Sequence, residues 1–301
     1  MNPSTSTRSV YRLEPHPEFG FLQIKPTPCL DEILRYYAEE FYSSDYPKLN
    51  DSGIEVQLRD KEFYDGQRSD LCANVAEIAG RPLAGMEVLD IGCGWGQALL
   101  YFQSQGMAGY GFDPVPEAVA YAQKLGLCAV QAGMETMDVF HRRRFDVVTL
   151  LNVLEHVADP VSVLGEIKER ILKPSGILAI DVPNEFNAFQ LCAQKVHELD
   201  PWWIAPPAHL NYFSAPTLKS LLAGAGYHVE RMEASFPMEM FLLFGHNYVR
   251  DGALGRQCHE QRMAFERNLR RQGCEKVLRE FYRSLAELSL GRQIVAYAAA
   301  S

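Results

Sequence analysis

The sequence predicts an α/β fold with a doubly wound sheet of seven strands, mostly parallel, with an antiparallel last strand. An apolar run at 87–91 leads into the alternating glycines Gly92, Gly94 and Gly96, and a segment with helical periodicity follows. Short apolar runs and helix-like segments then alternate along the chain as far as residue 230. A repeated strand, tight turn and helix are typical of parallel sheets that bind a ligand over the carboxyl ends of their strands.

The predicted sheet strands are short apolar runs, at 87–91, 109–112, 129–131, 145–151, 177–182, 226–230 and 293–298. Helices are expected where apolar residues recur every three or four positions, at 97–105, 116–125, 160–171 and 215–225. A hairpin would join the last two strands, which makes the last one antiparallel, but residues 237–291 lie between them. We therefore expect a helical insertion before the last strand, broken near Gly273.

The first 80 residues precede the sheet. Residues 19–24 resemble a short strand, and 30–41 and 63–79 have helical spacing. Two interpretations stay open for this segment: its helices cover an edge of the sheet, or its aromatic residues form a lid over the ligand site. Those aromatic residues are Tyr36, Tyr37, Phe41, Tyr42, Tyr46 and Tyr64.

The composition argues against several classes of function. The 301 residues include 38 acidic and 29 basic side chains, and the net charge of -9 disfavours nucleic acid as a partner, because phosphate binding needs a basic face. The seven cysteines are scattered without a C-x-x-C pair, as in reduced cytoplasmic proteins. The polar start lacks the apolar core of a signal peptide, and no apolar run approaches the ~20 residues of a membrane span. We therefore expect a cytoplasmic protein.

The glycine loop narrows the choice of ligand. A dinucleotide fingerprint reads G-x-G-x-x-G, whereas here the third glycine comes one residue early and Gln97 stands in its usual place. Asp90, just before the loop, would repel a phosphate but suits a cation. Asp113 ends the next strand, 21 residues after Gly92, and is placed to accept hydrogen bonds from ribose hydroxyls. An adenosine that carries a positive sulfonium and an amino-acid tail satisfies both carboxylates, and a nicotinamide dinucleotide does not.

With LDIGCGWG at 89–96 and Asp113, the chain resembles the class I S-adenosylmethionine-dependent methyltransferases, whose fold is Rossmann-like. FDVV at 145–148, NVLEHVADP at 152–160 and LKPSGILAI at 172–180 are similar to the fourth and fifth strands of that family. They most resemble the ubiquinone-biosynthesis O-methyltransferase branch and related small-molecule and sugar branches. The resemblance implies S-adenosyl-L-methionine as the cofactor and S-adenosyl-L-homocysteine as its product.

The resemblance also implies which residues contact the cofactor. They are Asp90, Gly92, Cys93, Gly94 and Gly96 at the methionine end, Asp113 and Pro114 at the ribose, Met134 and Glu135 beside the adenine, and Asn152 and Val153 beneath the sulfonium and its methyl group. For Met134, simple core packing remains an alternative.

Methyl transfer to a hydroxyl needs a base for the hydroxyl proton, and a histidine suits this task at neutral pH. His156 and His209 are the catalytic candidates, and for each a structural role in its loop is the alternative. Tyr212 and Trp203 are candidate acceptor contacts, with core packing as the alternative. Some sugar-type relatives carry a zinc-binding cysteine cluster near the N-terminus, but this chain has only Cys29 there, so no metal is expected.

These features imply an organisation and a function. Residues 1–80 form a helical or lid segment and 81–301 a methyltransferase domain, in which 184–214 faces the acceptor and 237–291 is the helical insertion. We expect methyl transfer to a small-molecule or glycan-like acceptor, with oxygen as the favoured acceptor atom. A regulatory protein that binds the cofactor without methylating is the alternative. For the insertion, contact with a second subunit and contact with a membrane surface are both open alternatives.

Overall fold

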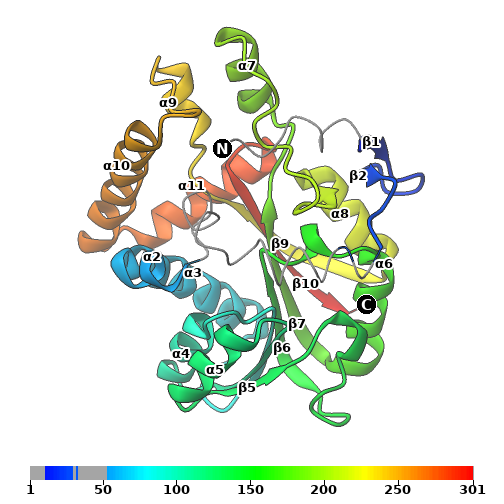
Figure 1. The fold of residues 1–301 in the computed structure, drawn as a ribbon. Helices are drawn as coiled ribbons and strands as arrows, with labels where there is room; N and C mark the ends of the chain where they lie inside the picture. Colours follow the sequence, from blue (N-terminus) through cyan, green and yellow to red (C-terminus); the bar gives the residue numbers. More distant parts are fainter. Residues whose placement is uncertain (1–10, 30–31, 33–52, 301) are drawn as a thin grey trace.

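The structure is a computed structural model in which residues 11–29, 32 and 53–300 are described (Figure 1). The helix expected at 30–41 and most of the proposed aromatic lid lie outside these residues. Of the lid candidates, Tyr64 is described, and it lines the cavity presented below.

A seven-stranded sheet forms the centre of the molecule, in the order β5-β4-β3-β6-β7-β10-β9. Its strands are β3 (Glu87–Ile91), β4 (Ala108–Asp113), β5 (Cys128–Gln131), β6 (Phe145–Leu151), β7 (Leu172–Pro183), β9 (Tyr227–Ala234) and β10 (Gln293–Ala300). The strands from β5 to β7 are parallel, and β10 lies antiparallel between β7 and β9. The predicted fold class, including its antiparallel last strand, is confirmed.

Helices cover both faces of this sheet (Figure 1). They are α3 (Lys61–Ala79), α4 (Gln97–Ser104) and α5 (Pro116–Lys124) on one face, and α6 (Pro160–Glu166), its continuation η4 (Ile167–Ile171) and α8 (Ala215–Gly224) on the other. Successive strand residues belong to different cores: Val88 packs with the first group of helices and Leu89 with the second. This alternation, with a period of two, is why an apolar run without polar interruptions marks a strand that is buried on both faces.

The expected insertion folds as the helices α9 (Glu239–Leu243), α10 (Gly252–Arg271) and α11 (Glu275–Glu287). Gly273 has φ +71°, so the chain turns between α10 and α11 where the sequence predicted a break. Helix α11 buries Leu278 and Leu285 in the core, whereas the buried residues of α10 include the charged Arg262 and Glu266. Helix α10 therefore approaches the protein through a polar face.

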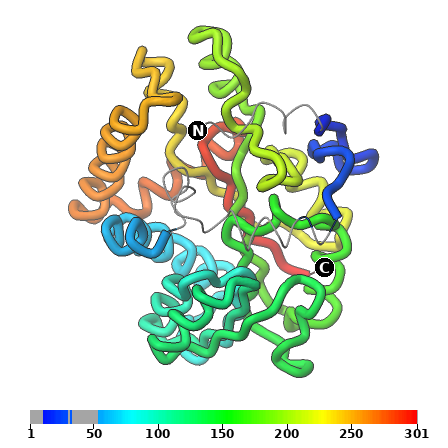
Figure 2. Tube along the Cα trace, viewed as in Figure 1, coloured from blue at the N-terminus to red at the C-terminus, as the bar shows by residue number. Residues whose placement is uncertain are grey.

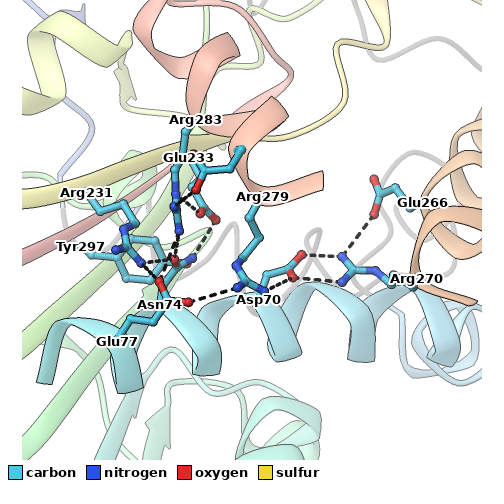
Figure 3. A network of polar contacts seen from close by, with 11 residues as sticks. Asp70, Asn74, Glu77, Arg231, Glu233, Glu266, Arg270, Arg279, Arg283 and Tyr297 are labelled. Carbon is cyan, nitrogen blue, oxygen red and sulfur yellow. Dashed lines mark hydrogen bonds and ion pairs between the residues drawn. The ribbon is translucent and has the colours of Figure 1, made fainter. Parts of the chain in front are cut away.

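Ion pairs join the insertion to α3, as Figure 3 shows. Arg270 Nη1 donates to Asp70 Oδ1 at 3.0 Å, and Arg283 Nε donates to Glu233 Oε1 at 2.9 Å. Asn74 of α3 is fully buried and donates to Glu233 Oε2 at 2.7 Å. These contacts hold α10 against α3, and α11 against β9.

A second, three-stranded sheet was not predicted. Strand β2 (Leu22–Lys25) pairs with both β1 (Arg12–Pro15) and β8 (Asn211–Tyr212). Figure 2 shows the N-terminal chain beside the segment that leads into α8. The N-terminal segment is therefore not purely helical; its described helices are α2 (Ile54–Arg59) and α3. The pairing with β8 joins residues far apart in sequence, and local patterns do not reveal such contacts.

Three further short elements shape the loops above the sheet. They are α7 (Ala188–Val196) and the single turns η2 (Met134–Thr136) and η3 (Leu154–His156). Asn211 of β8 is buried and donates to the carbonyls of Leu154 and Val157, at 3.2 and 2.6 Å, so the small sheet holds the η3 loop in place. Within the described ranges, no helix is both long and apolar enough to cross a membrane.

Candidate active site

A cavity of about 950 Å³ lies over the carboxyl ends of the central strands. This volume is near the upper end of ligand pockets, roughly 300–1,000 Å³. Most candidate residues line it, namely Asp90, Gly92, Cys93, Gly94, Asp113, Pro114, Met134, Glu135, Asn152, Val153, His156 and His209. Gly96, Tyr212 and Trp203 are not part of its lining.

Asp90 is buried at the end of β3 and faces the neighbouring strand. Thr149 of β6 lies directly opposite in the strand register, and its hydroxyl donates to Asp90 Oδ1 at 2.6 Å. Burial raises the pKa of Asp90 to about 7, although the Thr149 hydrogen bond and the charge of Arg68 oppose that rise. A cation bound next to this carboxyl group would favour its ionised form and lower its pKa. Thr149 is a site residue that the sequence analysis missed; its signal was a polar residue within the otherwise apolar run 147–151.

Asp113 connects the first two βα loops. Its Oδ2 accepts a hydrogen bond from the Gly94 amide and its Oδ1 one from the Val115 amide, both at 2.9 Å. Burial raises the pKa of Asp113, while these two hydrogen bonds oppose the rise. An ionised carboxylate has about four lone-pair positions, so both oxygens can still accept hydrogen bonds from a ligand.

The glycine loop meets the segment that follows β6 at close range. A Cβ on Gly92 would lie 2.5 Å from Val153 Cγ2, and Gly92 has φ +73°. Asn152 also adopts a left-handed conformation, with φ +57°. The backbone amide of Asn152 donates to the Asp181 carbonyl at 2.8 Å, and its side-chain Oδ1 accepts from Gln293 Nε2 at 2.6 Å. The loops after β3 and β6 thus lie against each other, and the second is held to β7 and β10 beside the cavity.

Gly94 and Gly96 form a matched pair for a stability measurement. A Cβ at Gly96 would lie 2.5 Å from Leu127 Cδ1, whereas a Cβ at Gly94 meets nothing within 4 Å. Both residues have positive φ, so alanine brings a backbone cost of roughly 1–2 kcal/mol at either position. Overpacking adds about 1–3 kcal/mol at Gly96 alone. We expect urea denaturation to show a clearly larger loss of stability for Gly96→Ala than for Gly94→Ala, and equal losses would contradict the packing role of Gly96.

His156 and His209 lie together in the lining of the cavity, with ring centroids 5.1 Å apart. His156 Nδ1 donates to the Ala208 carbonyl at 2.6 Å, which places the ring proton on Nδ1. Burial lowers the pKa of His156 to about 3 and that of His209 to about 4, with the charge of Arg292 adding to the effect at His209. Both rings are therefore neutral near pH 7.

The histidine pair also lies beside a carboxylate. Single ligand-type atoms of Glu155, His156 and His209 lie within 4.8 Å of one another, a group that could hold a metal ion. That the protein binds no metal stays a prediction.

Tyr212 and Trp203 are both buried, with 2% and 3% of their surface exposed. The Tyr212 hydroxyl accepts a hydrogen bond from the Ala205 amide at 3.2 Å, and the Trp203 ring meets Phe186 edge-on at 5.5 Å. Trp203 thus packs within the 184–214 segment, whereas Tyr212 packs with Ile24 of β2 as well as with Leu210.

Several cavity residues were not anticipated. Arg68 of α3 lines the cavity, and its charge acts on Asp90. Asp181 of β7, Arg262 of α10 and Arg292 also line it. Arg262 and Arg292 belong to the insertion and its flank, where helical spacing predicted the elements but not which polar side chains face inward.

Comparisons with known proteins agree with this geometry. A family model described as a methyltransferase domain matches residues 64–231. The ubiquinone biosynthesis O-methyltransferase of Actinobacillus pleuropneumoniae is 32% identical over 176 residues, which cover 51% of this chain and 74% of that protein. The protein of the same name from Caulobacter vibrioides is 30% identical over 160 residues, covering 48% of this chain and 61% of its own.

Solved structures show the same fold at lower identity. The magnesium protoporphyrin IX methyltransferase of Synechocystis, with bound S-adenosyl-L-homocysteine, aligns with a TM-score of 0.54 at 14% identity, covering 90% of this chain and 100% of that one. A plantazolicin methyltransferase, in complex with a triazolic desmethylPZN analogue and S-adenosyl-L-homocysteine, also aligns with a TM-score of 0.54 at 14% identity, covering 89% of this chain and 94% of that one. Because the family model matches more than half of the chain, the protein belongs to the class I S-adenosylmethionine-dependent methyltransferases, enzymes that use S-adenosyl-L-methionine as their cofactor.

Proposed function

We propose that this enzyme transfers a methyl group from S-adenosyl-L-methionine to an oxygen atom of a small-molecule acceptor. One observation carries the proposal: the carboxylates of Asp90 and Asp113 and the histidine pair His156 and His209 line one and the same cavity. The names of the curated relatives, which are O-methyltransferases, support oxygen as the acceptor atom.

The residues at the carboxylate end fit the cofactor. We assign Asp113 to the ribose hydroxyls, Asp90 to the cationic methionine end, and Met134 to the face of the adenine. Arg68 is assigned to the cofactor carboxylate, because it is the cation that acts on Asp90 across this end of the cavity. Gly92 lets the ligand approach the backbone where a Cβ would already collide with Val153.

The bound cofactor supplies an activated methyl group on a good leaving group. The chain must then hold the acceptor oxygen in line with that methyl group and receive the hydroxyl proton. His209 is assigned as the base, because its neutral ring lines the cavity and its side chain is 23% exposed there. His156 is assigned as a positioning residue, since its Nδ1 proton is held by the Ala208 carbonyl and its ring orients that of His209.

The proposal is tested with S-adenosyl-L-methionine labelled in its methyl group and fractions of small-molecule extract. We expect the wild-type enzyme to form a labelled product whose methyl group is bonded to oxygen by NMR. His209→Ala should slow this reaction roughly 100- to 10,000-fold, the usual contribution of a general base, with unchanged affinity for S-adenosyl-L-homocysteine. A product methylated at nitrogen or carbon would overturn the assignment to oxygen.

Cofactor affinity should depend on pH. Ionised Asp90 attracts a cation and protonated Asp90 does not, and its pKa in the empty site is about 7. Affinity for S-adenosyl-L-methionine should therefore fall as pH drops below 7, by at most roughly tenfold per pH unit, and level off above about 7.5. Isothermal titration between pH 5.5 and 8.5 measures this, with Asp90→Asn as the control that should flatten the profile. An affinity that rises toward acid pH would contradict the role of Asp90.

A further inference from the structure

The half of the cavity under the insertion is walled by charged and polar groups. Leu151, Asp181, Val295 and Glu233 form one row across β6, β7, β10 and β9, because each lies opposite the next in the strand register. Helices α10 and α11 cover this row with Arg262, Glu266, Arg270 and Tyr282, which also line the cavity. We call this space the acceptor lobe.

Most charges in the acceptor lobe are already paired with one another. Arg270 donates to Asp70 at 3.0 Å, as Figure 3 shows, and the Tyr282 hydroxyl donates to Glu266 Oε1 at 2.8 Å. Glu233 accepts hydrogen bonds from Asn74 at 2.7 Å and from Arg283 at 2.9 Å. These groups form the walls of the lobe and leave little hydrogen-bonding capacity for a ligand.

Asp181 and Arg262 differ from the other groups. Asp181 Oδ1 is buried without a hydrogen-bond partner, and so is Arg262 Nη2. The Arg262 guanidinium lies over the ring of Phe63, 4.8 Å from its centroid, and reaches Glu266 only through Nε at 3.4 Å. Its charge opposes the rise in the pKa of Asp181 that burial causes, so the two groups act on each other across the lobe. Within the described part of the chain, Asp181 and Arg262 form no ion pair with each other.

We propose that the acceptor lobe binds an uncharged, polyhydroxylated ring, such as a sugar or a cyclitol, between Asp181 and Arg262. This inference rests on the proposed methyl transfer and names the class of its acceptor. A hydroxyl group can donate to the Asp181 carboxylate and accept from the Arg262 guanidinium, so a ring with several hydroxyls offers partners for both. The pair is neutral as a whole and favours a ligand without net charge in the lobe.

Other classes of acceptor fit this lobe less well. An apolar or prenylated phenol would remove water from Asp181 and Arg262 without replacing its hydrogen bonds, and buried charged groups left in that state are strongly disfavoured. A carboxylate placed between the two unpartnered groups would be repelled by Asp181, and an ammonium group there would be repelled by the Arg262 guanidinium.

A panel of acceptors tests the proposal. The neutral members are myo-inositol and the methyl glycosides of glucose, galactose and rhamnose; the comparison members are glucuronate, glucosamine, catechol and a prenylated dihydroxybenzoate. We expect label from S-adenosyl-L-methionine to reach at least one neutral member, with kcat/KM at least tenfold above every comparison member. Preference for catechol or the prenylated phenol would overturn the proposal and leave methyl transfer intact. So would failure of every neutral member with an enzyme that binds S-adenosyl-L-homocysteine.

Variants connect that preference to the two residues. Asp181→Asn and Arg262→Gln should each raise KM for the methylated neutral acceptor about 10- to 100-fold, the usual effect of losing a hydrogen bond to a charged group. Their affinity for S-adenosyl-L-homocysteine should stay within about twofold of wild type. Arg271→Gln is the matched control, because Arg271 lies on the same helix with its side chain 63% exposed.

Two further variants distinguish the loss of acceptor contacts from a failure of the variant enzymes to fold. Arg262→Lys keeps a positive charge beside Glu266 but loses the planar fork, so we expect an intermediate KM. The double variant Asp181→Asn/Arg262→Gln should raise KM by less than the product of the two single effects, since both residues contact the same ring. Variants that bind S-adenosyl-L-homocysteine normally and keep the wild-type KM would overturn the proposal. If the wild-type enzyme did not bind the cofactor, the proposed function itself would be refuted.

Discussion

Replacing Asp90 with asparagine is expected to weaken binding of S-adenosyl-L-methionine about 10- to 100-fold, which corresponds to roughly 1.5–3 kcal/mol for a charged hydrogen-bond partner. Asparagine keeps the shape of the side chain and an oxygen that can accept from Thr149, at present 2.6 Å from Asp90 Oδ1. What the variant loses is the negative charge beneath the cationic end of the cofactor. Isothermal titration at pH 7.5 measures the change.

The product of the reaction provides a matched ligand for this variant. S-adenosyl-L-homocysteine has the same adenosine and amino-acid tail but carries no sulfonium charge. The affinity of Asp90→Asn should therefore fall more for the cofactor than for the product. Glu117→Gln is the control, because Glu117 is an exposed acid in the first turn of α5. An Asp90→Asn variant with wild-type affinity for both ligands would show that the carboxylate takes no part in binding.

Asp113→Ala is expected to reduce cofactor affinity by more than 100-fold and to lower stability as well. The ribose would lose a carboxylate that offers two acceptor atoms, and each charge-assisted hydrogen bond contributes about 1.5–3 kcal/mol. The amides of Gly94 and Val115, each now 2.9 Å from an Asp113 oxygen, would lose their partner. A buried donor left unpaired costs about 1–3 kcal/mol, so urea denaturation should show a loss in that range or above it.

Asp113→Asn separates the two effects. Asparagine supplies one acceptor oxygen, so it should preserve most of the stability but still bind the cofactor weakly. We expect titration to rank the affinities as wild type, then Asp113→Asn, then Asp113→Ala. If Asp113→Asn binds as tightly as wild type while Asp113→Ala merely unfolds, Asp113 acts only as a brace between the two loops and not on the ribose.

The sequence predicted this end of the site because its signals are local. Asp90, the glycines after it and Asp113 occupy fixed positions at the ends of two strands, and parallel strands bring those ends to one edge of the sheet. Strand β3 begins and ends where the apolar run predicted, and strand β4 differs by one residue at each end. Both strands are largely buried on both faces, so their mostly apolar runs are easy to delimit.

The rest of the site depends on contacts between distant segments. Thr149 meets Asp90 only through the register of β3 and β6. Arg262 enters the cavity because ion pairs such as Arg270 with Asp70 hold α10 against α3. Helical periodicity located α10 and α11, but a charged residue in a helix is ordinarily assigned to solvent. Burial of Arg262 and Glu266 follows from tertiary structure alone.

A crystal structure of the enzyme grown with S-adenosyl-L-homocysteine tests the central claim most directly. We expect the ribose hydroxyls at Asp113, the amino-acid tail over the glycine loop beside Asp90, and the sulfur atom on the side of the cavity that faces Asn152 and His209. A ligand bound away from both carboxylates, or a cavity that the protein fills itself, would contradict the account.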